Sequence, residues 1–206
     1  MTWPPPLKFT HTTESLWAIM HGMEPREDDY ILAIAGSGDQ ALAMLERGCR
    51  VRAVDGNPNQ LAYFERQISR IRREDEAFFK NTEVGAFEVR NHAMRVHLRH
   101  ARIMYFTPQR LQAIKQNLDN LELVNGDIAD EHGPFTKVYL SNIPDRSINV
   151  VCQTKAERIF MGCAMPTTEG LLRHNGFQRM IDIEEQLHAE QTRLHDHFFP
   201  RVYKKR

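Results

Sequence analysis

The stretch that decides the fold is YILAIAGSGD, residues 30–39, which is followed after a short interval by VRAVD, residues 51–55. Its first six residues form a continuous apolar run of strand length, as expected for a parallel strand that is covered on both faces. The turn GSGD at residues 36–39, which we call the glycine turn, leads into an amphipathic segment over residues 41–47. Gly48 follows that segment as a helix C-cap does. A strand, a helix and a second strand in quick succession predict an α/β fold with right-handed crossovers.

Elements on both sides extend this prediction. Residues 1–29 are predicted to form an N-terminal arm and helix, with a proline-rich start and a polar cap before the helix. Asn57-Pro58 caps a long amphipathic helix, and residues 74–120 are predicted to be a charged helical insertion. Further predicted elements are strands over 121–124 and 137–140, a helix over 154–161, a strand over 177–183, a helix over 184–195 and a last strand over 201–203. No fifth parallel strand is evident.

The composition excludes several classes of protein. The chain has 206 residues and a mass of 24.0 kDa, and its 41% hydrophobic residues can build a real core. Basic and acidic residues both number 27, which argues against a dedicated nucleic-acid binder. No stretch is apolar enough to cross a bilayer, and the first residues do not form a signal peptide. We therefore expect one cytoplasmic domain over residues 1–206, with no nucleic-acid or membrane partner.

The glycine turn and the acid that ends the next strand predict a nucleoside site. Glycine at Gly36 and Gly38 lets a ligand approach the backbone where a Cβ would block it. Asp55 follows roughly 20 residues later, where a carboxylate accepts hydrogen bonds from ribose hydroxyls. Together they indicate an adenosine-containing ligand at the carboxyl end of the sheet. A tight turn with a helix-capping Asp39 is the structural alternative.

Two later turns favour S-adenosylmethionine over a dinucleotide, although the G-x-G-x-x-A spacing of residues 36–41 fits a dinucleotide fingerprint as well. Asp127 and Ile128 follow the third strand, where an acid meets the adenine amino group and an apolar side chain covers the ring. The polar turn SNIPD, residues 141–145, follows the fourth strand and lies beside the reacting end of the ligand. In this order, the two turns are typical of an S-adenosylmethionine site.

Other clusters are interpreted as structural. The basic helix over residues 90–102 is interpreted as a solvated face, with binding of an acidic acceptor or RNA as the alternative. His188, His195 and His197 are interpreted as exposed histidines, because their spacing does not suit a shared metal ion. The three cysteines are too scattered for a disulfide framework or a zinc site. We expect no metal.

Four segments form a more specific pattern than the glycine turn alone. They are ILAIAGSGDQAL at residues 31–42, VDGNPNQL at 54–61, EAFF at 76–79 and YLSNI at 139–143. These segments resemble the S-adenosylmethionine:diacylglycerol 3-amino-3-carboxypropyltransferases, the first enzymes of betaine-lipid synthesis, of which this chain resembles a short, divergent member. The resemblance covers the first half of the chain well, together with one later motif.

The resemblance implies a Rossmann-like, doubly wound class I fold and an enzyme that uses S-adenosylmethionine as co-substrate. It implies attack on the γ-carbon of the methionine chain, transfer of the 3-amino-3-carboxypropyl group and release of methylthioadenosine. The acceptor is then a small molecule. Alternatively there is none, and the chain cyclises or is eliminated. Methyl transfer, a non-catalytic nucleoside-binding module and a dinucleotide oxidoreductase are the rival hypotheses.

The implied site residues follow the turns. The backbone turn and Asp55 hold the nucleoside, Asp127 and Ile128 hold the adenine, and Ser141 with Asn142 orients the amino-acid end. Asp39 either caps its helix or reaches the ligand's ammonium group. The full predicted set is Ala35, Gly36, Ser37, Gly38, Asp39, Asp55, Asn57, Asp127, Ile128 and Ser141 for binding, and Ser141, Asn142 and Tyr139 for catalysis. Tyr105 is a candidate for stacking near the sulfonium, although a core or surface role is the favoured interpretation.

Overall fold

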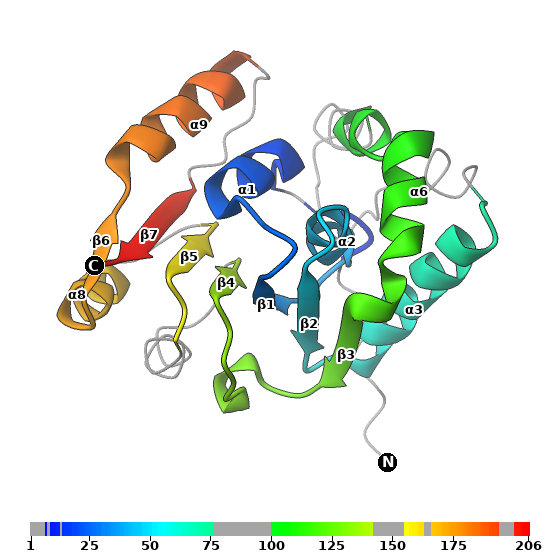
Figure 1. The fold of residues 1–206 in the computed structure, drawn as a ribbon, viewed down its shortest axis with the longest axis horizontal. Helices are drawn as coiled ribbons and strands as arrows, with labels where there is room; N and C mark the ends of the chain where they lie inside the picture. Colours follow the sequence, from blue (N-terminus) through cyan, green and yellow to red (C-terminus); the bar gives the residue numbers. More distant parts are fainter. Residues whose placement is uncertain are drawn as a thin grey trace.

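Within the described part of the chain, seven strands form one sheet in the order β3-β2-β1-β4-β5-β7-β6 (Figure 1). The computed structural model describes residues 7, 9–12, 14–75, 100–141, 155–162, 166–193 and 200–206. The strands are β1 (Tyr30–Ile34), β2 (Arg50–Asp55), β3 (Leu121–Asn125), β4 (Lys137–Leu140), β5 (Arg158–Met161), β6 (Phe177–Arg179) and β7 (Arg201–Lys205). The helices are α1 (Leu16–Met23), α2 (Asp39–Leu45), α3 (Pro58–Arg72), α6 (Pro108–Gln116), α8 (Pro166–His174) and α9 (Ile181–Arg193), with short 3₁₀ turns η1 (Leu118–Asn120) and η2 (Ile128–Asp130).

The sheet is doubly wound, as predicted. Strands β3, β2, β1, β4 and β5 are parallel, and β7 runs antiparallel between β5 and β6. The order reverses between β1 and β4, where Ala33 is the register partner of Tyr139. In open α/β sheets, ligands bind outside the carboxyl ends of the strands at such a reversal. The fold therefore places the candidate site at the ends of β1, β2 and β4.

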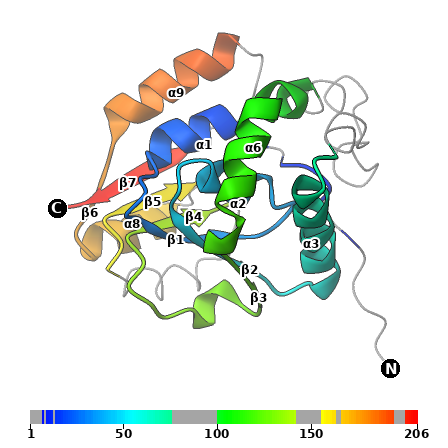
Figure 2. The ribbon, with the colours of Figure 1, turned by 45° about the vertical axis from the view of Figure 1, so that its right-hand side comes forward.

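Apolar side chains alternate between the two faces of the sheet. In β1, Ile31 and Ala33 belong to the core beneath α1, α2, α3, α6 and α9, whereas Leu32 belongs to the core on the other face. The second core includes Leu172 of α8 and Ile128 of η2. Figure 2 shows α1, α2, α6 and α9 together on one side of the sheet. Burial on both faces explains why β1 reads as a continuous apolar run.

The predicted helix caps are confirmed. The Ser15 side chain accepts a hydrogen bond from the backbone N–H of Ala18 at the start of α1. Asn57 does the same for Asn59 at the start of α3, which has Pro58 in its first turn. Gly48 has a φ of +81°, the left-handed conformation that a helix-terminating glycine adopts.

Two predictions in the second half of the chain are wrong. Residues 158–161, predicted as part of a helix, form the fifth parallel strand β5. This run of four residues is buried along its whole length, so it lacks the period that separates a strand from a helix. The predicted strand over 177–183 ends at Arg179, and α9 begins at Ile181 rather than at Glu184. The Ile-Asp-Ile alternation at 181–183 therefore lies in a helical turn.

A buried ion pair fixes the opposite, amino-terminal ends of the strands. Lys137 Nζ lies 2.6 Å from Asp29 Oδ2 and 2.7 Å from the backbone oxygen of Glu24. The Thr136 hydroxyl and the Arg26 backbone N–H also donate to Asp29. Burial by itself raises the pKa of Asp29, but these hydrogen bonds outweigh it, and the net effect is a lowered pKa. The cluster joins the segment that follows α1 to the start of β4.

Candidate functional site

The glycine turn after β1 uses the left-handed backbone conformation that glycine adopts readily. Gly36 and Gly38 have φ values of +49° and +90°, and the Gly38 N–H donates to the Ala35 oxygen at 2.7 Å. Ala35 is fully buried, and its N–H donates to the Val54 oxygen, which joins the turn to β2. The Ser37 hydroxyl accepts from the Asp39 N–H, while its backbone oxygen accepts from Gln67.

The two glycines have different neighbours. A Cβ at Gly38 would lie 2.4 Å from the ring of Phe64, whereas a Cβ at Gly36 would meet no atom of the described residues within 4 Å. Gly38 is therefore needed for close packing of the turn on α3. No described residue covers the position of a Cβ at Gly36, so its backbone is accessible as a ligand-binding turn requires. The sequence assigns ligand approach to both glycines. Their neighbours in the structure fit that role for Gly36 and a packing role for Gly38.

Replacing Gly38 by alanine should therefore destabilise the fold more than replacing Gly36. Gly38→Ala combines a left-handed backbone with a clash against Phe64 and should lower the free energy of unfolding by about 2–3 kcal/mol. Gly36→Ala meets only the backbone strain, about 1 kcal/mol. Urea denaturation of both variants measures the difference, and equal losses would contradict the packing role of Gly38.

The carboxylate of Asp55 lies directly beside this turn. Its Oδ2 accepts a hydrogen bond from the Gly36 N–H at 3.1 Å, and its Oδ1 accepts from the Asn57 N–H at 2.9 Å. Two backbone donors therefore orient the carboxylate at the end of β2. A carboxylate has about four acceptor positions, so it can also receive ribose hydroxyls. The open backbone of Gly36 and the oriented acid of Asp55 together fit a nucleoside.

The other predicted residues on the nucleoside side lie at nearby strand ends with structural roles of their own. Asn57 is buried and caps α3. Asp127 is exposed and caps η2 by accepting from the Ala129 N–H at 2.9 Å. Ile128 is buried in the core beneath the sheet. The contact of Asp127 and Ile128 with an adenine ring stays a prediction.

The N-terminal strap, which we define as residues 9–12 and Glu14, is held at the carboxyl ends of the strands. Gln60 of α3 pairs with both backbone groups of Phe9, through the Phe9 N–H at 3.1 Å and the Phe9 oxygen at 2.5 Å. Tyr63 donates to the Thr10 oxygen at 2.9 Å. The Thr12 N–H donates to Asp39 at 3.0 Å. Backbone pairing of this kind fixes the position of the strap beside the glycine turn.

The strap brings a carboxylate that the sequence did not single out. Glu14 is 6% exposed, and its two oxygens accept hydrogen bonds from the hydroxyls of Tyr139 and Ser141. The Ser141 contact measures 2.6 Å. Gln40 donates to the Tyr139 hydroxyl at 3.3 Å and to the Thr12 hydroxyl at 2.7 Å. Tyr139 of β4 and Ser141, the residue directly after β4, thus both reach Glu14, which joins the predicted pair.

Asp39 does not cap α2, and its contact with a ligand's ammonium group stays a prediction. Its side chain is fully buried and forms an ion pair with Arg102, whose Nε lies 3.0 Å and 3.1 Å from the two carboxylate oxygens. It makes no capping hydrogen bond at the start of α2. Arg102 also donates to Gln67 at 2.8 Å, and Gln67 in turn holds the Ser37 oxygen. The ion pair of Asp39 and Arg102 therefore supports the glycine turn through Gln67.

The structure changes one further interpretation, that of Arg102, and confirms the favoured one for Tyr105. Arg102, assigned to a solvated basic face, is 3% exposed because it pairs with Asp39. Tyr105 lies in the core against Trp17 and Phe106, and its hydroxyl donates to Glu46 just beyond the end of α2. That position is at the far end of α2 from the glycine turn, so Tyr105 does not stack near the site and has the core role.

Some predicted features lie outside the described residues. They are Asn142 and the rest of its turn, the EAFF motif, residues 90–99 of the basic helix, and His195 with His197. Among the residues that are described, no group of three or more His, Cys, Asp or Glu side chains gathers as a metal site does. None of the described helices combines the length and apolar character of a membrane span. His188 lies exposed on α9.

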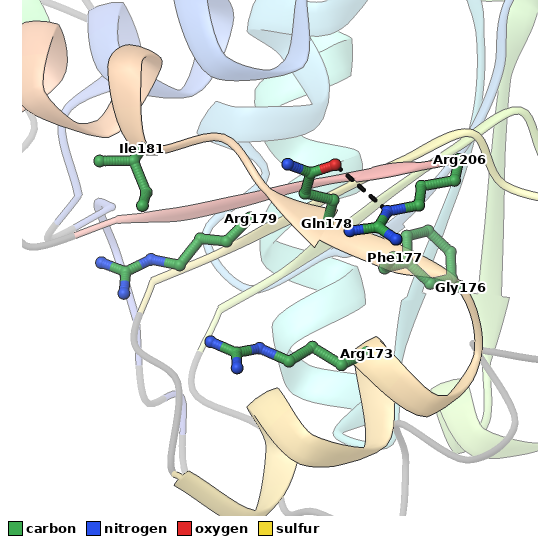
Figure 3. A pocket seen from close by; sticks show the side chains of 7 residues that line it. All are labelled: Arg173, Gly176, Phe177, Gln178, Arg179, Ile181 and Arg206. Atoms are coloured by element: carbon green, nitrogen blue, oxygen red, sulfur yellow. Dashed lines mark hydrogen bonds between the residues drawn. The ribbon is translucent and has the colours of Figure 1, made fainter.

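A separate hollow of about 390 Å³ lies along β6, at the edge of the sheet opposite to β3 (Figure 3). It is lined by Arg173, Gly176, Phe177, Gln178, Arg179, Ile181 and Arg206. Arg173 and Arg179 both pair with Glu169, and Arg179 also pairs with Glu184. Arg206 donates to Gln178 at 3.2 Å. These contacts offset much of the positive charge of the arginines that line the hollow. The hollow is remote from the point between β1 and β4 where the strand order reverses.

Solved structures with the same architecture identify the fold. A ribosomal protein L11 methylase from Lactobacillus delbrueckii subsp. bulgaricus superposes with a TM-score of 0.54 at 14% identity, over 98% of this chain and 83% of that one. The [4+2]-cyclase SpnF gives 0.52 at 11% identity, over 92% and 79%. A precorrin-8w decarboxylase from Methanobacterium thermoautotrophicum gives 0.50 at 17% identity, over 80% and 72%. The chain has the Rossmann-like class I methyltransferase fold.

At these identities the similarity establishes the fold alone. No protein-family model matches the sequence, and no curated protein is significantly similar to it.

Proposed function

We propose that the protein is an S-adenosylmethionine-dependent enzyme that transfers the 3-amino-3-carboxypropyl group to a small acceptor. The observation that carries the cofactor assignment is the pairing of Gly36 with Asp55. An open stretch of backbone and an oriented carboxylate lie together at the ends of β1 and β2, next to the reversal of strand order. The fold supports the same ligand, because its structural neighbours include a methylase.

The preference for aminocarboxypropyl transfer comes from the sequence resemblance. Several residues that carry the resemblance contact the N-terminal strap, namely Asp39, Gln40, Gln60, Tyr139 and Ser141. In this proposal the motif therefore does more than bind a nucleoside, since it also brings Glu14 to the end of β4. A plain nucleoside site needs no such group.

S-adenosylmethionine supplies a sulfonium that activates the methyl, ribose C5′ and γ-carbons. In the proposed reaction, the acceptor's lone pair forms a bond to the γ-carbon, the carbon–sulfur bond breaks with its electrons moving to sulfur, and an amine acceptor then loses its proton to solvent or a base. The sulfur departs in methylthioadenosine. Because the leaving group is good, the residues of the site mainly orient the acceptor and exclude water.

Product analysis tests the proposed function. The protein is incubated with S-adenosylmethionine alone and then with a fraction of small metabolites, and the nucleoside products are identified by mass spectrometry. Methylthioadenosine with an acceptor heavier by the aminocarboxypropyl group is the expected result. Methylthioadenosine without an acceptor product indicates cyclisation or elimination. S-adenosylhomocysteine would instead support methyl transfer, the second candidate, which the methylase among the structural neighbours favours.

Removing the Asp55 carboxylate should weaken ligand binding. Asp55→Ala takes away the acceptor for ribose hydroxyls and the partner of the Gly36 N–H, so the Kd for S-adenosylmethionine should rise at least about tenfold. Isothermal titration calorimetry measures the effect. Asp130→Ala is the control, since Asp130 is exposed on η2 and its loss should leave the Kd unchanged. Equal affinities for wild type and Asp55→Ala would show that the ribose lies elsewhere.

A further inference from the structure

We propose that the hollow along β6 is a second ligand site, which binds the phosphate group of a small phosphorylated molecule with the guanidinium of Arg206 as its main partner (Figure 3). The volume of about 390 Å³ lies in the range of small-molecule sites. The hollow borders the last strand of the sheet, away from the ends of β1 and β4. The inference therefore goes beyond the proposed function and does not rest on it.

The lining of the hollow is basic. Three of the seven described residues that form it are arginines, and none of the seven is an aspartate or a glutamate. Arginine offers a planar fork of N–H donors that matches the oxygens of a phosphate. Phe177 lines the hollow as well, together with Ile181, whose side chain is a large apolar group that is 53% exposed. The lining therefore fits a molecule that joins an anionic group to an apolar body.

The guanidinium of Arg206 is oriented without being neutralised. Its Nε donates to the Gln178 side-chain oxygen at 3.2 Å, the contact drawn as a dashed line in Figure 3. The backbone N–H of Arg206 donates to the Gly176 oxygen at 3.0 Å. Within the described part of the chain, Arg206 forms no ion pair, and its two Nη groups have no hydrogen-bond partner. These two groups can donate to two oxygens of one phosphate.

The other arginines share their carboxylates. Arg173 and Arg179 approach the same oxygen of Glu169, at 3.1 Å and 3.7 Å. Glu184 is shared in the same way by Arg179 and Arg201, at 2.6 Å and 3.5 Å. Two carboxylates therefore serve three guanidinium groups. One positive charge remains in excess, in addition to the charge of the guanidinium that contacts Gln178.

A phosphate monoester matches this excess. It carries about −1.5 to −2 charges at pH 7 and three acceptor oxygens, whereas a carboxylate brings one charge and two oxygens. Lys205 adds to the positive field, since its Nζ lies 5.5 Å from the centroid of the Phe177 ring. Basic and acidic residues are equal in number over the whole chain, so the excess is local. A local excess in a small hollow suits a small molecule better than a nucleic acid.

Titration with phenyl phosphate tests the site. The full chain is labelled with ¹⁵N, and its amide signals are followed by NMR at low ionic strength, because salt screens exposed charges. The shifts should saturate and be largest at Gly176, Gln178 and Arg206. The amide of Gly36, in the candidate nucleoside site, should not shift. Phenyl sulfate has a similar shape but only one negative charge, and it should bind at least about threefold more weakly.

Variants with the same change in net charge separate the hollow from a general effect of charge. Arg206→Met should raise the Kd for phenyl phosphate at least about fivefold, and Arg173→Met about twofold. Both side chains are exposed, so neither variant should disturb the fold. Arg50→Met is the matched control, because this arginine is 60% exposed on β2, and it should leave the Kd unchanged.

Four results would overturn the proposal. They are no saturating shift up to about 10 mM phenyl phosphate, shifts that are largest at Gly36, a loss of affinity in Arg50→Met equal to that in Arg206→Met, and equal affinities for phenyl phosphate and phenyl sulfate. None of them bears on the proposed function, because this titration involves neither S-adenosylmethionine nor turnover. A failed product analysis would likewise leave the phosphate site unaffected.

Discussion

Arg102→Met should cost about 3–5 kcal/mol of the free energy of unfolding, because it leaves the carboxylate of Asp39 buried without its cation. The side chains of this pair are 2% and 0% exposed, so water cannot replace the lost partner. The free energy of unfolding of a typical domain is only about 5–15 kcal/mol. Urea denaturation measures the loss. Ligand binding should fall as well, because Asp39 is the first residue of α2 and directly follows the glycine turn.

Two comparisons show whether charge is the cause. Arg50→Met removes a cation whose pair with Glu122 is largely exposed, at 60% and 44%, and should cost less than about 1 kcal/mol. Adding Asp39→Asn to Arg102→Met removes the unpaired charge and should recover part of the loss. A double variant as unstable as Arg102→Met would mean that the lost packing of Arg102 dominates, and a loss below about 1 kcal/mol in the single variant would contradict the buried pair.

The first half of the fold was predictable because its signals are local. A glycine turn between an apolar run and an amphipathic helix is determined by neighbouring residues, and so is the Asn57-Pro58 cap. The second half depends on partners far along the chain. Residues 158–161 become β5 only because β4 and β7 lie on either side of them. No periodicity within four buried residues reveals this.

The residues of the candidate site likewise fall into two groups, those with a local sequence signal and those placed by distant contacts. Gly36 and Asp55 were found from sequence because the turn and the strand end have fixed positions in a parallel sheet. Glu14 and Arg102 were missed as site residues, since burial of a charged side chain depends on tertiary contacts that lie 125 residues away for Glu14 and 63 for Arg102. A polar run before a helix predicts a cap, and Ser15 is that cap. The only available signal for Glu14 was its place one residue before Ser15, and an acid there is ordinarily exposed.

Lys137→Met should be about as damaging as the loss of Arg102, with a cost of about 3–5 kcal/mol at neutral pH. The ammonium of Lys137 and the carboxylate of Asp29 are 2% and 6% exposed and 2.6 Å apart. Without Lys137, the Glu24 oxygen also loses a donor. Arg173→Met serves as the control, since its pair with Glu169 is exposed at 68% on the arginine side and should contribute less than about 1 kcal/mol.

The cost of Lys137→Met should shrink in acid, and the sign follows from Asp29. In the wild type its pKa is lowered below the ordinary 3.8, so its stabilising effect is complete above that value and is lost as the pH falls through the folded-state pKa. In the variant, burial without the cation raises the pKa of Asp29, and a protonated Asp29 tolerates burial better. The variant therefore regains part of its stability as the pH falls through the raised pKa of Asp29, whereas the contribution of Asp29 to the wild type declines only below about pH 4. Denaturation at pH 7 and pH 4 measures the gap, and a gap that stays constant or widens in acid would mean that Asp29 is not the partner whose charge matters.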